Sequence, residues 1–265
     1  MKYSIITVNY NNCEGLRRTI ESVIHQNFRD FEFIIIDGGS TDGSKEVLQA
    51  YDHHINYWVS EPDGGIYQAM NKGIAQAQGE YLNFMNSGDC FFSPDILERV
   101  AQYKSDADII VGRDYHFNAE TGQGHASLQP PRTTMIHFFM ATLDHQSSFI
   151  RRELFKDSPY REDYRLVSDW IFFTEKIVSE GKQVQFIPDI VCHREEGGLS
   201  EQQHERNRAE IGKFLHEYLP WGVYQDYATL SKLDKVSVYR LFAICDDEWK
   251  RKILVFCIKL IKKLL

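Results

Sequence analysis

The sequence has few cysteines, no long apolar run and no excess of basic residues, and each absence excludes a class of protein. Its five cysteines are scattered and odd in number, without metal-ligand spacing, which favours free thiols in a reducing compartment. No uninterrupted apolar run reaches the roughly 18 residues that a membrane-spanning helix needs. The net charge of −8 argues against general nucleic-acid binding, which requires a cationic surface.

The charge is unevenly distributed. Residues 249–265 contain six basic residues and no acidic one, so this segment carries +6 and the rest of the chain carries −14. Lys252, Lys259 and Lys263 share one stripe of a helix that is otherwise largely apolar. A basic amphipathic helix of this kind is typical of membrane-surface elements. The alternative is a terminal helix that packs on the domain or on a dimer partner.

The first 90 residues alternate between strand and helix patterns. The composition, 43% hydrophobic and 26% charged, is that of a globular protein with a sizeable core. The alternation favours a parallel sheet with right-handed crossovers, in which ligands bind beyond the carboxyl ends of the strands. The turns after Val8, Ile36 and Met85 should therefore share one site. Strands are expected at 4–8, 31–36, 55–59 and 81–85, and helices at 14–26 and 66–78. A further helix should carry Val47 and Leu48, with Ser44 as its cap.

The pattern loosens after this point. We expect helices at 93–103 and 168–179, strands at 107–111, 145–150 and 184–190, an irregular excursion or hairpin at 114–135, a loop at 195–200, and a mostly helical, charged chain from Gln202 onward.

Two aspartates follow predicted strands. Asp89 ends the turn Asn86-Ser-Gly-Asp89, where one carboxylate could hold Mg²⁺ or Mn²⁺ against the charge of a leaving diphosphate. Asp37 precedes two glycines and could accept hydrogen bonds from a nucleotide base or ribose. Capping of a turn is the alternative for both residues.

A glycine-containing loop, Glu61-Pro-Asp-Gly-Gly-Ile-Tyr67, follows the third predicted strand. Its glycines would allow the backbone to approach a ligand closely. Lys72, on the next helix, could reach a phosphate, although a solvated surface charge is the simpler interpretation of a lone lysine.

Asp169 opens the helix predicted at 168–179. It could complement the helix dipole, or it could act as a general base that removes a proton from an attacking hydroxyl. Asp144 and Asp163 are competitors for that role. His145 and His193 each lie at a predicted strand end. A hydrogen-bonded structural role is usual for histidine, and His193 could instead join Asp89 at a metal.

The combination of these motifs resembles family 2 glycosyltransferases, particularly those of bacterial surface-polysaccharide clusters such as the colanic-acid type. His145-Gln146, Ser168-Asp-Trp170 and Gly197-Gly-Leu-Ser200 extend the resemblance to about residue 200. The motifs that carry it over the first 90 residues are Ile5-Ile-Thr-Val-Asn-Tyr10, Ile36-Asp-Gly-Gly-Ser-Thr-Asp-Gly43, Glu61–Tyr67, Met70-Asn-Lys-Gly73, Gly79-Glu80 and Asn86–Asp89.

The resemblance implies an α/β GT-A fold, with a Rossmann-like, mostly parallel central sheet and flanking helices. It also implies inverting transfer of a sugar from a nucleotide-diphosphate sugar. Asp37 would contact the base, Asp89 and His193 would hold Mn²⁺ or Mg²⁺, and Asp169 would be the catalytic base. The remaining donor-binding residues would be Thr7, Val8, Asn9, Tyr10, Asp63, Lys72, Asn86, Ser87 and Gly88.

The chain departs from the family motif in one place. Asn86 and Gly88 occupy positions where aspartates are usual, so Asp89 would hold the cation with little help. We therefore expect weak metal affinity without the donor. A nucleotidyltransferase is the enzymatic alternative, but Asn9-Tyr-Asn-Asn12 is not the glycine- and basic-rich phosphate loop that it would need. A non-catalytic nucleotide-sugar sensor is the other alternative.

The resemblance also suggests an organisation and a location. Residues 1–200 would form the transferase domain, with donor binding in 1–90 and acceptor binding and catalysis in 91–200. Residues 201–265 would be a helical extension that ends in the basic tail. We expect a cytoplasmic protein on the inner face of the bacterial inner membrane. Its acceptor would be a saccharide or a polyprenyl-linked molecule, and a homodimer is one possible oligomeric state.

Overall fold

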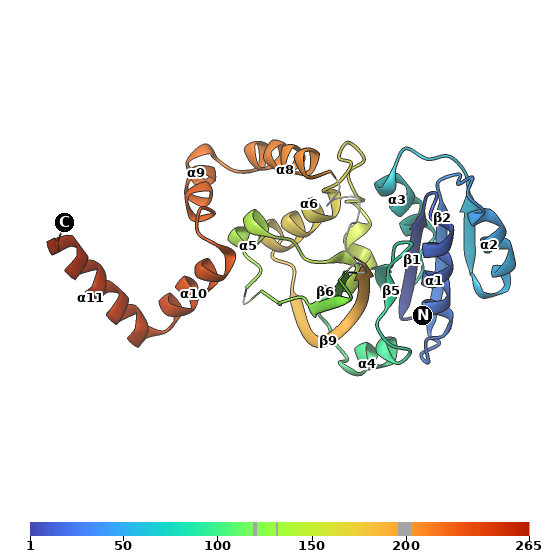
Figure 1. Ribbon diagram of the computed structural model, residues 1–265, viewed down its shortest axis with the longest axis horizontal. Coiled ribbons are helices and arrows are strands. Elements are labelled where there is room, and N and C mark those ends of the chain that lie inside the picture. The colour runs from blue at the N-terminus through green and yellow to red at the C-terminus, as the bar shows by residue number, and fades with distance from the viewer. Residues whose placement is uncertain (119–120, 131, 196–202, 265) are drawn as a thin grey trace. The chain divides into compact units, whose positions relative to one another are not determined.

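One mixed sheet organises the first of two units in the protein. The computed structural model describes residues 1–118, 121–130, 132–195 and 203–264. The strands run in the order β3-β2-β1-β4-β8-β6-β9-β5, with β7 paired to β6. Figure 1 labels β1, β2, β5, β6 and β9 of this sheet. The strands are β1 (Tyr3–Asn9), β2 (Phe31–Asp37), β3 (Tyr57–Ser60), β4 (Tyr81–Phe84), β5 (Cys90–Phe91), β6 (Ile109–Asn118), β7 (Gln123–Ala126), β8 (Ser148–Arg151) and β9 (Val184–Glu195).

Helices connect most of these strands. The α-helices are α1 (Cys13–Ile24), α2 (Ser44–Ala50), α3 (Ile66–Gln76), α4 (Ile96–Gln102), α5 (Met135–Met140), α6 (Ser168–Thr174), α8 (His204–Tyr218), α9 (Trp221–Leu230), α10 (Lys235–Asp246) and α11 (Glu248–Leu264). Short 3₁₀ turns are η1 (Asp52–His54), η2 (His145–Ser147) and η3 (Arg152–Phe155), and a π-helical turn, η4 (Glu175–Ser179), continues α6.

The sheet has a parallel half and a mixed half. β1 pairs in parallel with both β2 and β4, and β2 pairs in parallel with β3, as the alternating pattern predicts. Beyond β4 the sheet differs from that expectation, because β8 is antiparallel to β4 and to β6. β9 is parallel to β6, and the short β5 is antiparallel to β9.

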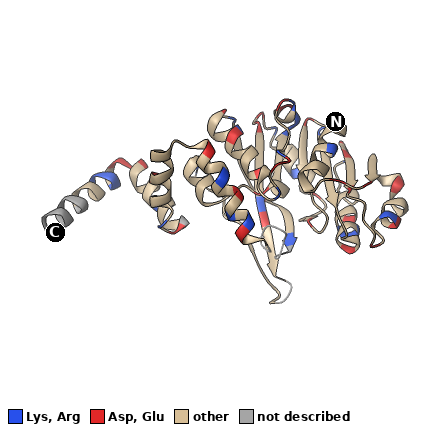
Figure 2. Cartoon of the chain, turned by 90° about the horizontal axis from the view of Figure 1, so that it is seen from above, with Lys and Arg blue, Asp and Glu red and all other residues tan. Residues whose placement is uncertain are grey.

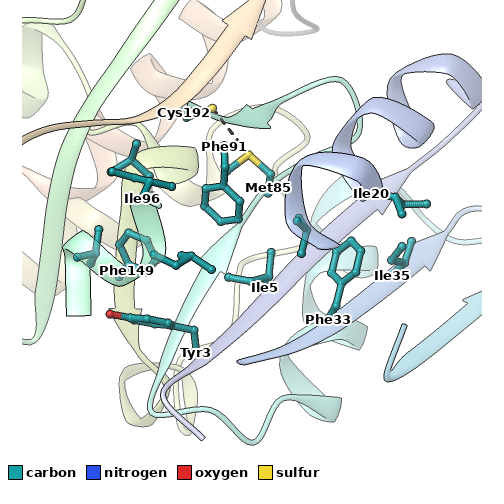
Figure 3. Close-up of a cluster of buried hydrophobic side chains, with 14 of the residues drawn as sticks. Tyr3, Ile5, Ile20, Phe33, Ile35, Met85, Phe91, Ile96, Phe149 and Cys192 are labelled. Carbon is teal, nitrogen blue, oxygen red and sulfur yellow. Dashed lines mark hydrogen bonds between the residues drawn. The ribbon is translucent and has the colours of Figure 1, made fainter. Parts of the chain in front are cut away.

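Strand parity divides the core of the first unit into two layers. Tyr3 and Ile5 of β1 and Phe33 of β2 point into a buried cluster with residues of α1, α2 and α4 (Figure 3). The alternate side chains of β1 and β2 face α3, as expected for period-2 strands. Gly73 of α3 lies so close that a Cβ there would come within 2.5 Å of Ile6 Cγ2. A side chain at position 73 would therefore push α3 away from the sheet.

Several element boundaries differ from those expected. α2 begins at Ser44 itself, and the preceding cap is Gly43, whose φ of 97° favours glycine. Ser44 is therefore not the cap, and its backbone N–H instead donates to Asp42 Oδ1 (3.1 Å). The excursion expected at 114–135 contains the β6–β7 hairpin. β9 continues five residues past the predicted end at Ile190, and 196–200 of the predicted loop lie outside the described residues.

The second unit comprises 130–141 and 213–265. Phe139 of α5 packs on Tyr224 and Tyr227 of α9, with ring centroids 5.7 and 5.8 Å apart. The chain is helical from α8 onward, as expected, and the proposed domain boundary at residue 200 stays a prediction.

Acidic residues are followed by basic ones at the start of α11 (Figure 2). Lys250 pairs there with Asp247 (3.3 Å) and Lys252 with Glu248 (2.8 Å), so part of the basic charge of the tail is balanced locally. Among the residues that the structure describes, we find no helix with the length and hydropathy of a bilayer span.

Candidate active site

The carboxyl ends of β1, β2 and β4 meet, as the strand pattern predicts. Asn9 Nδ2 donates to Asp37 Oδ1 across the ends of β1 and β2 (2.7 Å). Thr7 is fully buried and its hydroxyl donates to the carbonyl oxygen of Met85 (2.6 Å). Ser87 N–H donates to the Val8 carbonyl oxygen (3.1 Å), which ties the turn after β4 to β1. Thr7 and Val8 thus join the strand ends rather than expose polar atoms to a ligand.

Asp37 is fully buried, and donors from the protein surround its carboxylate. Oδ1 accepts from Asn9 and from the Ser40 hydroxyl (2.5 Å), and Oδ2 accepts from Ser40 N–H (3.0 Å) and the Ser60 hydroxyl (2.6 Å). Burial raises the pKa of Asp37, but these hydrogen bonds outweigh it and leave the pKa below its usual range. A carboxylate has about four acceptor positions. A nucleotide base would therefore have to displace one of these donors to contact Asp37.

Tyr10 and Asp63 flank Gly38, the residue after β2. A Cβ at Gly38 would lie 2.9 Å from Asp63 Oδ2 and 3.2 Å from Tyr10 Cδ2, so a larger residue would close the approach between these loops. The Lys72 ammonium is partly exposed and pairs with Glu61 (2.7 Å), which follows β3. The structure does not bring Lys72 to the Asn86–Asp89 turn.

The Asn86–Asp89 turn is held by its own backbone and by α1. Gly88 adopts a φ of 107°, which favours glycine, and its N–H donates to Thr19 Oγ1 (3.0 Å). The Thr19 hydroxyl also lies 2.7 Å from the carbonyl oxygen of Asp89. The glycine at position 88, where the family motif usually has an aspartate, is therefore explained by its backbone conformation, which permits the turn that presents Asp89.

Asp89 carries a carboxylate whose charge is poorly stabilised by the protein. Gln146 Nε2 donates to Oδ2 (3.1 Å), but burial dominates and raises the pKa of Asp89 to about 6. A bound cation would supply the missing positive charge. Asp89 fits the chemistry of a cation ligand for this reason.

Asp169, at the start of α6, accepts two hydrogen bonds from distant parts of the chain. The Tyr67 hydroxyl donates to Oδ1 (2.6 Å), and Oδ2 lies 2.8 Å from His145 Nδ1. Burial raises the pKa of Asp169, but its hydrogen bonds with His145 and Tyr67 outweigh this effect. The net pKa lies below the usual range, so Asp169 is charged at neutral pH. Its side chain is 15% exposed.

The 3₁₀ turn η2 connects three acidic residues of the site. His145 contacts Asp169, Gln146 contacts Asp89, and the Ser147 hydroxyl donates to Asp114 Oδ1. One rigid turn therefore fixes the spacing between Asp89 and the candidate base. The competing Asp163 is instead half-exposed and pairs with Arg161 (3.0 Å).

His193 does not join Asp89, because strand parity turns it to the other face of β9. Cys192 is buried in the core, so its neighbour His193 points away from that side. The His193 ring stacks on Tyr115 and packs on Phe117, with centroids 5.8 and 5.5 Å apart. The structure brings Arg194 to the Asp89 side instead, where its charge acts on the pKa values of Asp89 and Asp114.

A second candidate for cation binding lies beside Asp89. Asp114, His116 and Asp144 each offer a ligand atom, and these atoms lie within 4.8 Å of one another. Asp114 is fully buried, and its Oδ2 has no hydrogen-bond partner among the described residues. Arg194, however, donates to His116 Nδ1 (3.1 Å), which leaves the proton of a neutral ring on Nε2. Arg194 would have to release this ring before His116 could bind a metal.

Sequence reasoning did not assign roles to Tyr67, Asp114, His116 or Arg194. Tyr67 ends the glycine loop motif, which was the available signal. Asp114 and His116 were placed in an irregular excursion, although β6 continues through Asn118. If β9 had been predicted to run to Glu195, the alternation of side chains along a strand would have placed Arg194 on the same face as Cys192.

Comparison with known proteins points to one family. A family model described as "Glycosyl transferase family 2" matches residues 4–159. An uncharacterized glycosyltransferase of Mycobacterium tuberculosis is 32% identical over 230 residues, which cover 83% of this chain and 86% of that protein. A PGL/p-HBAD biosynthesis glycosyltransferase of Mycobacterium bovis is 28% identical over 206 residues, which cover 75% of this chain and 78% of that protein.

Two solved structures share the fold. S. aureus TarS 1-349, solved in complex with UDP-GlcNAc, has a TM-score of 0.64 and 18% identity, over 86% of this chain and 70% of that one. The mannosyltransferase PcManGT of Pyrobaculum calidifontis, in complex with GDP-Man and Mn²⁺, has a TM-score of 0.58 and 16% identity, over 95% and 82% of the two chains.

Proposed function

Because the chain belongs to glycosyl transferase family 2, we propose that it transfers a sugar, with inversion, from a nucleotide-diphosphate sugar to an acceptor hydroxyl. The acceptor that we propose is a saccharide, either lipid-linked or part of a growing surface polysaccharide. The observation that carries this proposal is the pair of consecutive residues His145 and Gln146, which tie Asp169 and Asp89 to one turn. A base and a cation ligand at fixed separation are what displacement of a diphosphate by a hydroxyl requires.

The donor would occupy the crevice at the carboxyl ends of β1, β2 and β4. The structural neighbours that carry UDP-GlcNAc and GDP-Man in their solved complexes support this assignment. In our proposal Tyr10 and Asp63 flank the nucleotide, Asp37 orders the loop beneath it, and the Asn86–Asp89 turn lies at the diphosphate. Lys72 would reach a phosphate only by releasing Glu61.

A divalent cation, Mn²⁺ or Mg²⁺, would be held by Asp89 together with the diphosphate oxygens. When bound, such an ion neutralises the charge that builds on the leaving diphosphate. The raised pKa of Asp89 supports this assignment, as does the Mn²⁺ in the mannosyltransferase complex. Asp114 and Asp144 would lie beside this cation and add negative charge near it. We do not assign His193 to the ion, because its ring packs on Tyr115.

Asp169 would accept the proton of the acceptor hydroxyl. The oxygen would then attack the anomeric carbon from the face opposite the diphosphate, which inverts the configuration there. Two of the carboxylate acceptor positions are filled by Tyr67 and His145, which leaves others for the acceptor. The lowered pKa keeps Asp169 charged and ready to act as a base at neutral pH.

A screen of nucleotide sugars with Mn²⁺ or Mg²⁺ by thermal shift would test donor binding. The preferred donor would then be incubated with saccharide and polyprenyl-linked acceptors, and the anomeric configuration of the product read by NMR. We expect a cation-dependent rise in melting temperature and a product of inverted configuration. A retained configuration, or donor binding without turnover under any condition, would contradict the proposal.

We also propose that the protein is cytoplasmic and that 249–265 bring it to the inner face of the membrane. The basic and apolar residues of this segment support the proposal, although Lys250 also pairs with Asp247 and Lys252 with Glu248. Sedimentation with anionic liposomes tests it. Binding that survives deletion of 249–265 would refute the role of the tail.

A further inference from the structure

The role of His145 goes beyond contact with one carboxylate. Its Nδ1 lies 2.8 Å from Asp169 Oδ2, and its Nε2 lies 3.0 Å from Asn86 Nδ2. Both ring nitrogens are therefore engaged, one by the candidate base and the other by the turn that holds Asp89. The His145 side chain is only 14% exposed, so these contacts lie largely out of water.

We propose that His145 is a positioning residue, which orients Asp169 through Nδ1 and orients Asn86 of the donor turn through Nε2. The inference rests on the proposed function and adds to it a residue that would act on base and donor at once.

Hydrogen-bond chemistry selects one tautomer of this ring. A carboxylate only accepts, so Nδ1 must carry the proton that faces Asp169. The lone pair of a neutral ring is then on Nε2, where the Asn86 amide donates to it. The opposite tautomer would set a lone pair against the carboxylate and a proton against the amide N–H groups. The same contact fixes the Asn86 amide, whose buried Oδ1 has no partner among the described residues and stays open to a ligand hydroxyl.

The turn that carries His145 is anchored on both sides. The buried side chain of Asn83, on β4, donates to the carbonyl oxygens of Gln146 (2.8 Å) and Ser148 (3.0 Å). Ser147 is fully buried and holds Asp114. His145 therefore extends from a rigid support, which is what a residue needs in order to hold another group within a fraction of an ångström.

His145 could itself be the base only if Nε2 faced the acceptor. Asn86 occupies that nitrogen, whereas Asp169 retains acceptor positions beyond those used by Tyr67 and His145. The geometry thus favours action through Asp169 rather than direct proton transfer to His145.

Two substitutions separate the two contacts. The amide nitrogen of asparagine can take the place of the Nδ1 donor, and the amide oxygen of glutamine can take the place of the Nε2 acceptor. His145→Asn should keep kcat within about tenfold of wild type because it retains a donor to Asp169, whereas His145→Gln and His145→Ala should lose about 100-fold. Donor affinity should follow the other contact, falling about fivefold in His145→Asn and His145→Ala but little in His145→Gln.

The measurements are kcat under saturating substrates and the donor Kd by calorimetry, on full-length variants whose melting temperatures match the wild type within a few degrees. Equal losses of kcat in His145→Asn and His145→Gln would overturn the inference, as would an unchanged kcat in His145→Ala. If wild type itself shows no turnover, the proposed function fails. If wild type is active and the variants do not separate, only the role of His145 fails.

Discussion

The packing of α3 on the sheet yields a quantitative prediction, because α3 also carries Tyr67. In Gly73→Ala the new methyl group would lie 2.5 Å from Ile6 Cγ2, inside any normal contact distance. Overpacking of this kind typically costs about 1–3 kcal/mol. Replacement of a helical glycine by alanine gains about 1 kcal/mol in helix propensity, so the net expected loss of stability is about 0–2 kcal/mol.

Gly212→Ala is the matched control, since Gly212 lies within α8 and a Cβ there would meet no atom within 4 Å. The control should be stabilised by up to about 1 kcal/mol, from propensity alone. The propensity gain cancels between the two variants, so their unfolding free energies should differ by the overpacking cost of about 1–3 kcal/mol. Urea unfolding followed by circular dichroism measures this difference.

Gly73→Ala should also lower transfer activity. A shift of α3 away from the sheet displaces Tyr67, whose hydroxyl lies 2.6 Å from Asp169. Gly212→Ala should leave activity unchanged. If Gly73→Ala were as stable and as active as Gly212→Ala, the close approach of α3 to β1 and its part in positioning Asp169 would both be refuted.

Three further predictions follow from the charges of the site. Tyr67→Phe removes a hydrogen bond that lowers the pKa of Asp169. We therefore expect kcat to fall about tenfold and the acid limb of the pH profile of kcat to move to higher pH. An acid limb that stays in place would argue against Asp169 as the base. The cation competes with a proton for Asp89, whose pKa is about 6. The affinity for Mn²⁺ in the presence of donor should therefore weaken by about tenfold for each pH unit below that value. If titration calorimetry finds no such dependence, Asp89 is not a ligand of the cation. Because burial disfavours the charged form of Asp89, Asp89→Asn without cation should melt at a higher temperature than wild type at pH 7.5. This gain should begin to shrink as the pH falls to about 6 and should disappear near 3.8, the ordinary pKa of an aspartate, where the unfolded chain is protonated as well. An unchanged or lower melting temperature at pH 7.5 would show that this charge is not destabilising.

The parallel half of the sheet was predictable because each strand is a short, largely apolar run that is followed by polar residues. The meeting of Asn9 with Asp37 follows directly from that pattern, since parallel neighbours end at the same edge. The mixed half was not predictable in this way. The antiparallel pairing of β8 with β4 depends on contacts between distant segments, which leave no local period in the sequence.

The site shows the same division. Asp89 and Asp169 could be selected from local motifs, whereas the hydrogen bond of Tyr67 to Asp169 joins residues 102 positions apart. His193 illustrates a failure of boundary prediction. With a strand end placed at Ile190, histidine seemed free to turn toward Asp89, but the continued strand fixes its direction by parity and packs it on Tyr115.

The role that we propose for Asp169 is that of the base in sugar transfer from a nucleotide-diphosphate sugar. Its most direct test compares wild type with Asp169→Asn, which has nearly the same shape but cannot accept the acceptor proton. We predict that transfer of labelled sugar falls by at least about 100-fold while the donor Kd stays within about threefold of wild type. Transfer at a wild-type rate by Asp169→Asn would contradict the account.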